Sequence, residues 1–266
     1  MAQDIAFYKD WFAQYVAGYA QEDIETQRYL DLKRDHTLRV FENASLIAET
    51  LPLPEQTLKI ALLGALFHDV GRFEQFSLYH TYSDRDSVNH GYLGSRILRS
   101  ENVLAEEKKE IRQSVRAVVA LHNRLVLPRA IPQHIREATN IVRDSDKLDI
   151  FPILVANFIH DGSKNDVVTM GLQDCPSAYS PNALSNVLNG ESVRYAEMQY
   201  VNDFKLLLSS WVFNLEFSTS MQILYKRGYM ESLLDTLPDL PEMKKVKHAV
   251  RNEMQRVLAG YLSEEE

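Results

Sequence analysis

The feature that most constrains this chain is an apolar segment that ends in two adjacent polar residues. Residues 62–67 read LLGALF, His68 and Asp69 follow directly, and Gly71 and Arg72 come just after. A segment that is apolar all round is typical of a helix buried on every side. Polar side chains at its end need partners, because an unpaired buried imidazole or carboxylate loses its hydration. Hydrogen bonds to the backbone would provide them, and so would a shared divalent metal ion.

Composition limits the classes of partner that this chain can have. Of its 266 residues 45% are hydrophobic and 25% are charged, with a formal net charge of −8. The negative charge argues against bulk binding to nucleic acid or to an anionic membrane surface. The single cysteine, Cys175, excludes an internal disulfide and a thiolate metal cluster. No signal peptide or membrane span is recognisable, so we expect a cytoplasmic protein.

Apolar residues recur at helical spacing through most of the first 151 residues. We expect helices over residues 4–30, 36–50, 55–69, 90–98, 106–121 and 135–151. Alternating runs of β-branched residues are missing there. Residues 72–89 lack periodicity and predict a loop. The sequence therefore predicts an all-α fold, and in the absence of a repeat or a flexible linker we expect one domain over residues 1–266.

The second part of the chain has a less regular pattern. Residues 160–192 contain several pairs of turn residues, so we expect loops there, with residues 167–170 (VVTM) as a candidate short strand. Residues 194–228 are again helical in pattern, and Pro241 precedes a final helix.

Besides His68 and Asp69, two further regions of the sequence offer candidate metal ligands, one at His36 and one around Asp146. His36 is expected at the start of a helix, and Asp146 shares the inward face of its helix with neighbouring apolar residues. Asp144 could instead lie on the solvent side, and Asp149 could cap the helix or pair with Lys147.

The order His36, His68-Asp69, Asp146 resembles the HD superfamily of metal-dependent phosphohydrolases. The motifs that carry the resemblance are FHDVGR at residues 67–72 and RDSDKLD at residues 143–149. The family's last aspartate stands in a context that selects Asp146. The resemblance implies an HD helical bundle over about residues 30–155. Residues 156–266 would then be a C-terminal helical extension, with the roles of lid, dimer surface and additional core all open.

Two further histidines resemble ligands of the binuclear branches of this family, which include the HD-GYP phosphodiesterases. His90 is the second residue of NHGYLGSRIL, which begins at Asn89, and His122 ends VRAVVALH. The resemblance implies that His36 and Asp146 hold one metal, that His90 and His122 hold another, and that Asp69 bridges them beside His68. The GYP element is absent and Asn123 replaces a second histidine, so cyclic-di-GMP specificity does not transfer.

The ligand set leaves the metal itself open. It suits one or two divalent ions per chain, with Mn, Fe, Ni, Co, Zn and Mg as candidates. Such ions can activate water and hold phosphoryl oxygens. Asp69 and Arg72 are the expected catalytic residues, and the Arg72 guanidinium could bind a substrate phosphate or form a salt bridge. The loop residues Asp84, Arg85 and Asp86 could contact the substrate, but a solvated loop is the favoured interpretation.

The function that follows is hydrolysis of a phosphate ester, either a monoester or a diester, of a nucleotide or similar small molecule. A homodimer is compatible with this interpretation. Two alternatives stay open: a di-iron oxygenase, a chemistry of some HD relatives, and a ligand-binding regulator that has kept the pocket without the activity.

Overall fold

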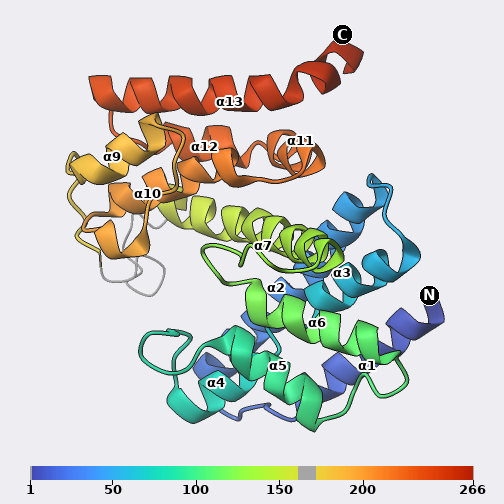
Figure 1. Cartoon of the computed structure of the whole chain (residues 1–266). Helices are drawn as coiled ribbons and strands as arrows, with labels where there is room; N and C mark the ends of the chain where they lie inside the picture. Colours follow the sequence, from blue (N-terminus) through green and yellow to red (C-terminus); the bar gives the residue numbers. More distant parts are fainter. Residues whose placement is uncertain (1, 161–171, 266) are drawn as a thin grey trace. The chain divides into compact units, whose positions relative to one another are not determined.

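The computed structural model describes residues 2–160 and 172–265, and its regular elements in these ranges are helices (Figure 1). Among the described residues the β contacts amount to one isolated bridge, between Gln173 and Tyr200. The prediction of an all-α fold is confirmed. The candidate strand at residues 167–170 lies outside the described residues.

Two compact units make up the chain, Met1–Asp146 and Lys147–Glu266. The boundary falls inside one long helix, α7, which runs from Gln133 to His160. All six metal ligands expected from the sequence belong to the first unit. The prediction of a single domain over the whole chain stays a prediction.

The first unit is organised around α3. Besides the first part of α7, its helices are α1 (Ala2–Ala17), α2 (Ile24–Glu49), α3 (Glu55–Phe67), α4 (Gly71–Tyr79), α5 (His90–Ser100) and α6 (Lys109–Leu121). Helix α3 packs against α1, α2 and α6, and α5 packs against α4 and α6. Leu63, Leu66 and Phe67 are fully buried. The apolar segment is therefore a core helix, as its pattern predicts.

The expected helix over residues 4–30 is wrong, because the chain breaks between α1 and α2. Asp23 caps α2, and its side chain accepts a hydrogen bond from the backbone N–H of Thr26. Since α2 begins at Ile24, His36 lies inside this helix and not at its start. The capping aspartate was the signal in the sequence that marks the true start.

The expected loop over residues 72–89 is wrong in its first half, where α4 forms. A nine-residue helix is too short to show a clear period, and its buried residues include the polar Gln75. Gly71 begins α4, and a Cβ there would lie 2.3 Å from the carbonyl oxygen of His90. Glycine at this position therefore allows the start of α4 to approach the start of α5.

The second unit contains helices α9 (Pro181–Leu188), α10 (Val201–Ser210), α11 (Ser218–Lys226), α12 (Tyr229–Asp235) and α13 (Pro241–Glu265), with short 3₁₀ turns η1 (Tyr195–Glu197) and η2 (Trp211–Asn214). The final helix begins at Pro241 as expected. The helical stretch predicted over residues 194–228 is interrupted after η2. In the described part of the chain, no helix combines the length and the hydropathy needed to cross a bilayer.

Candidate metal centre

Asp69 lies at the centre of a buried cluster of histidines. It follows α3 in the turn before α4, and only 3% of its surface is exposed. Its Oδ2 lies 3.6 Å from Nε2 of His36 and 3.7 Å from Nε2 of His68. Its Oδ1 lies 3.3 Å from Nε2 of His90 and 3.9 Å from Nε2 of His122. Each carboxylate oxygen thus faces its own pair of imidazole nitrogens.

Asp146 joins this cluster through His36. Its Oδ1 lies 3.2 Å from Nε2 of His36, and 28% of its side chain is exposed, against 6% for His36. The structure therefore brings together the six predicted ligands, which come from α2, the turn after α3, the start of α5, the end of α6, and α7.

Hydrogen bonds fix which nitrogen of the histidines carries the proton. Nδ1 of His68 lies 2.8 Å from the carbonyl oxygen of Ala65, and Nδ1 of His122 lies 2.8 Å from that of Val119. A carbonyl oxygen can only accept, so both Nδ1 atoms are protonated. Nε2 of each neutral ring is then a lone-pair donor directed into the cluster.

These nitrogens are close enough to repel one another. Nε2 of His68 lies 3.2 Å from Nε2 of His36, and Nε2 of His90 lies 3.0 Å from Nε2 of His122. Facing lone pairs at such distances need a proton or a metal ion between them. The donor set of imidazole nitrogens and carboxylate oxygens, with no thiolate, fits a divalent metal of the first transition row. The residues present therefore suit the group that the sequence pattern implies.

Burial keeps two of these rings neutral. Burial, together with the neighbouring His90 and His68 and against the opposing effect of Asp69, lowers the pKa of His122 to about 3. Burial also lowers the pKa of His68. For Asp69 burial acts to raise the pKa, but the charges of Lys33 and Arg72 and the neighbouring histidines outweigh it and hold that pKa well below the ordinary range. The cluster thus combines neutral imidazoles with an ionised carboxylate, which is the protonation state that metal binding requires.

Asp84 is a site residue that the sequence interpretation placed in a solvated loop, and that interpretation is wrong. Both its carboxylate oxygens lie 2.8 Å from Nδ1 of His90. It also accepts hydrogen bonds from Arg72, Gln75 and Asn123. Burial acts to raise its pKa, but the hydrogen bond from His90 and the charges of His90 and Arg72 lower it to about 2. No pattern in the sequence around Asp84 indicates that its side chain contacts His90.

Two cations neutralise Asp69 from opposite sides. Nζ of Lys33 donates to Oδ2 of Asp69 at 2.9 Å. Nε of Arg72 lies 3.5 Å from Oδ1 of Asp69, while its Nη1 donates to Asp84, Gln75 and the carbonyl of Tyr82. Lys33 was not among the predicted residues, although it lies one helical turn before His36 on α2. Arg72 therefore links Asp69 with Asp84.

Two buried polar atoms beside the cluster have no hydrogen-bond partner among the described residues, Nε of Arg72 and Oδ1 of Asn123. A buried donor that is left without a partner costs free energy of about 1–3 kcal/mol. The unpaired donor of Arg72 lies next to the carboxylate around which the ligands gather. It forms an ion pair with that carboxylate at 3.5 Å but no hydrogen bond, so it can still donate to a further acceptor.

The structure also places other acidic and histidine residues of the predicted region. Asp144 is 1% exposed, so its expected place on the solvent side is wrong. His134 hydrogen-bonds to Ser114, and His80 ends α4 in a left-handed conformation. His160 ends α7, and the Asp161 that follows it lies outside the described residues.

The family comparison matches this geometry. The model of the HD domain family matches residues 34–159. The chain contains an HD domain. Its match begins just before His36 and extends past Asp146 to the end of α7, so it includes all six predicted ligands. HD domains are mostly metal-dependent hydrolases. Searches of curated proteins and of solved structures gave no match.

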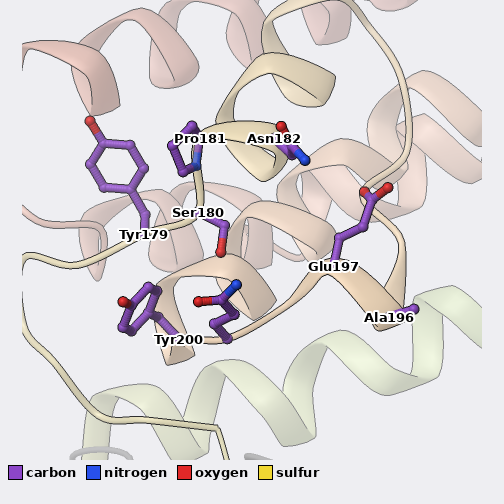
Figure 2. A pocket seen from close by; sticks show the side chains of 8 residues that line it. Tyr179, Ser180, Pro181, Asn182, Ala196, Glu197 and Tyr200 are labelled. Carbon is purple, nitrogen blue, oxygen red and sulfur yellow. The ribbon is translucent and has the colours of Figure 1, made fainter.

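A separate pocket lies in the second unit, beyond the HD match. It has a volume of about 320 Å³, and Figure 2 shows Tyr179 and Tyr200 on its left and Glu197 on its right. Ser180 at its floor donates its hydroxyl to the buried Asp203. Asp203 also accepts hydrogen bonds from three backbone N–H groups, so its oxygens are used to hold the chain together.

Proposed function

We propose that this protein is a metal-dependent phosphohydrolase that cleaves a phosphate ester of a nucleotide or of a similar small molecule. The observation that carries the proposal is the position of Asp69, because its two carboxylate oxygens face two different pairs of imidazole nitrogens. A single carboxylate placed in this way is suited to bridge two cations.

Each residue of the cluster has a distinct part in this proposal. His36, His68 and Asp146 would hold one ion, and His90 and His122 would hold the other, with Asp69 between the two groups. The bound ions supply Lewis acidity, which makes water a nucleophile near neutral pH and neutralises phosphoryl oxygens. One or two ions per chain are compatible with the donor set, and Mn, Fe, Ni, Co, Zn and Mg remain candidates for their identity.

Arg72 is the proposed contact to the substrate phosphate. Its Nε is a buried donor that forms an ion pair with Asp69 at 3.5 Å but makes no hydrogen bond in the described part of the chain. The bonds from its Nη1 to Asp84, Gln75 and Tyr82 fix the guanidinium plane, so little conformational entropy is lost when a phosphoryl oxygen binds. A fixed cation of this kind stabilises the negative charge of the transition state.

The test is a hydrolysis assay on the full chain loaded in turn with Mn, Fe, Co, Ni, Zn and Mg. Substrates are p-nitrophenyl phosphate, bis(p-nitrophenyl) phosphate and a panel of nucleotide monoesters and diesters. We expect phosphate release with at least one metal, and its loss in Asp69→Asn. Activity that requires iron and consumes oxygen would favour an oxygenase. No metal-dependent hydrolysis, with tight binding of a small molecule that survives Asp69→Asn, would favour a regulator.

A further inference from the structure

A basic hollow lies at the far end of the α5–α6 pair in the first unit. It has a volume of about 200 Å³, and its lining includes Arg99 from the end of α5 and Lys109, Arg112 and Arg116 from α6. No aspartate or glutamate lines it. We name these four cations and the space between them the basic hollow. Its charge is opposite in sign to that of the whole chain, whose net charge is −8.

None of the four cations has a carboxylate partner within the described residues. Elsewhere on the surface, Arg34, Arg251 and Arg256 each lie within 3 Å of a carboxylate oxygen. The chain has 37 acidic residues for 29 basic ones, so the hollow does not lack partners because acids are scarce. Because no carboxylate of the described residues neutralises these four cations, the basic hollow has a positive electrostatic potential, which favours binding of an anion.

The three cations on α6 repel one another, and the hydrogen bonds that they make do not neutralise their charges. Lys109, Arg112 and Arg116 are three and four residues apart, which places them on one face of the helix. Like charges at such spacing repel one another and destabilise a helix. Nη1 of Arg112 donates to the carbonyl of Ala105, and Nε of Arg116 donates to that of Ser95. These bonds hold both guanidiniums in place without cancelling their charge.

We propose that the basic hollow is a binding site for a small multivalent anion of the phosphate class, such as pyrophosphate or the polyphosphate chain of a nucleotide. Arginine side chains held in fixed positions suit phosphate oxygens, which they bind through paired hydrogen bonds. The volume accommodates a few phosphoryl groups. The net negative charge of the chain disfavours a nucleic-acid strand, which would require an extended basic surface.

This site is separate from the candidate metal centre. His90 begins α5 and Arg99 lies near its end, about 13 Å further along at the usual rise of about 1.5 Å per residue. His122 follows the end of α6, whereas Lys109 begins it. The two sites thus lie at opposite ends of the same two helices, and an anion in the basic hollow would not contact the metal ligands.

The experiment measures binding of inorganic pyrophosphate and tripolyphosphate to the full chain by titration calorimetry. The variants are Arg112→Gln/Arg116→Gln in the basic hollow, Asp69→Asn in the metal centre, and Arg28→Gln/Arg129→Gln as a control with the same loss of charge at exposed positions. We expect the first variant to weaken binding about tenfold or more, since each lost charged hydrogen bond costs about that factor. In Asp69→Asn the binding that depends on Arg112 and Arg116 should remain, and the control variant should bind as the wild type does.

Four results would overturn the proposal. They are no binding to the wild type, unchanged binding in Arg112→Gln/Arg116→Gln, loss of binding in Asp69→Asn, and loss of binding in the control. A single-stranded oligonucleotide is titrated in parallel. If it binds more tightly than tripolyphosphate and depends on Arg112 and Arg116, the basic hollow belongs to a nucleic-acid surface instead. Melting temperatures of all variants show that each is folded before it is titrated.

Discussion

The carboxylate of Asp84 lies 2.8 Å from Nδ1 of His90 and accepts its hydrogen bond. In His68 and His122, a backbone carbonyl accepts the hydrogen bond from Nδ1 instead. The difference follows from position. His68 and His122 come at the ends of helices and bond to the carbonyl three residues earlier. His90 is the first residue of α5 and has no preceding helical turn, so the loop supplies a carboxylate. A carboxylate partner makes an imidazole a stronger ligand than a carbonyl does.

Replacing Asp84 should therefore weaken metal binding at the pair His90 and His122 selectively. We expect Asp84→Asn to reduce affinity for the second ion about 10–100-fold, because partners of this kind contribute that much at other metal sites. Metal titration followed by elemental analysis measures it. The control is Asp86→Asn, an exposed neighbour bonded to Ser83. Equal losses at both ions, or no loss at either, would show that Asp84 does not position His90.

The substitution Gly71→Ala tests whether the fold depends on the close approach of α4 and α5. A Cβ at residue 71 would meet the carbonyl oxygen of His90 at 2.3 Å, so Gly71→Ala must move backbone. We expect the free energy of unfolding to fall by about 2 kcal/mol or more, as for an overpacked core. In the matched control Gly260→Ala, no atom lies within 4 Å of the new Cβ. That change should leave stability equal or raise it by up to about 1 kcal/mol. Urea denaturation compares the two, and equal effects would contradict this account.

Stability of the metal-free protein should depend on pH through His122. Burial first of all, then the neighbouring histidines, lower its pKa to about 3 from the usual 6.5, so below 6.5 the unfolded chain binds a proton that the folded chain does not. The free energy of unfolding should fall as pH drops from 6.5 towards 3, by about 1.4 kcal/mol per pH unit for this one group.

Denaturation of the chelator-treated protein between pH 7 and pH 4 measures that slope. The variant His122→Gln should have a smaller slope, and His68, whose pKa burial also lowers, accounts for part of what remains. A free energy of unfolding that stays constant from pH 7 to pH 5 would contradict the assignment of His122 as a neutral buried ring.

Lys33 should matter most when no metal is bound. Its Nζ lies 2.9 Å from Oδ2 of Asp69, and an uncompensated buried carboxylate is costly. We expect Lys33→Met to lower the melting temperature of the metal-free protein more than that of the metal-loaded protein, since bound cations also neutralise Asp69. Calorimetric melting with and without metal measures the difference, with Arg34→Gln, at an exposed ion pair, as the control. Equal losses in both states would contradict this role.

The all-α class and the metal ligands could be predicted because their signals are local or ordered along the chain. The apolar run before His68 marks a buried helix, and the order of histidines and aspartates marks the cluster. The true start of α2 was missed because the aromatic period of residues 4–30 hides the break before Asp23. Helix α4 was missed because nine residues show too little of a period.

The supporting residues of the site could not be predicted for a different reason. Asp84 and Lys33 act through contacts with residues distant in the sequence, His90 and Asp69, and neither contact leaves a pattern in spacing. Asp144 was misplaced because its position on a helix was judged from neighbours on the same helix. Its burial depends on packing against other elements of the fold.

The most direct test is the number of metal ions bound per chain, measured by elemental analysis after saturation and removal of excess metal. The account predicts two ions per chain in the wild type and fewer than one in Asp69→Asn, because both ions share that carboxylate. It would be contradicted by a wild-type protein that binds no ion with any of the candidate metals, or by an Asp69→Asn protein that binds two.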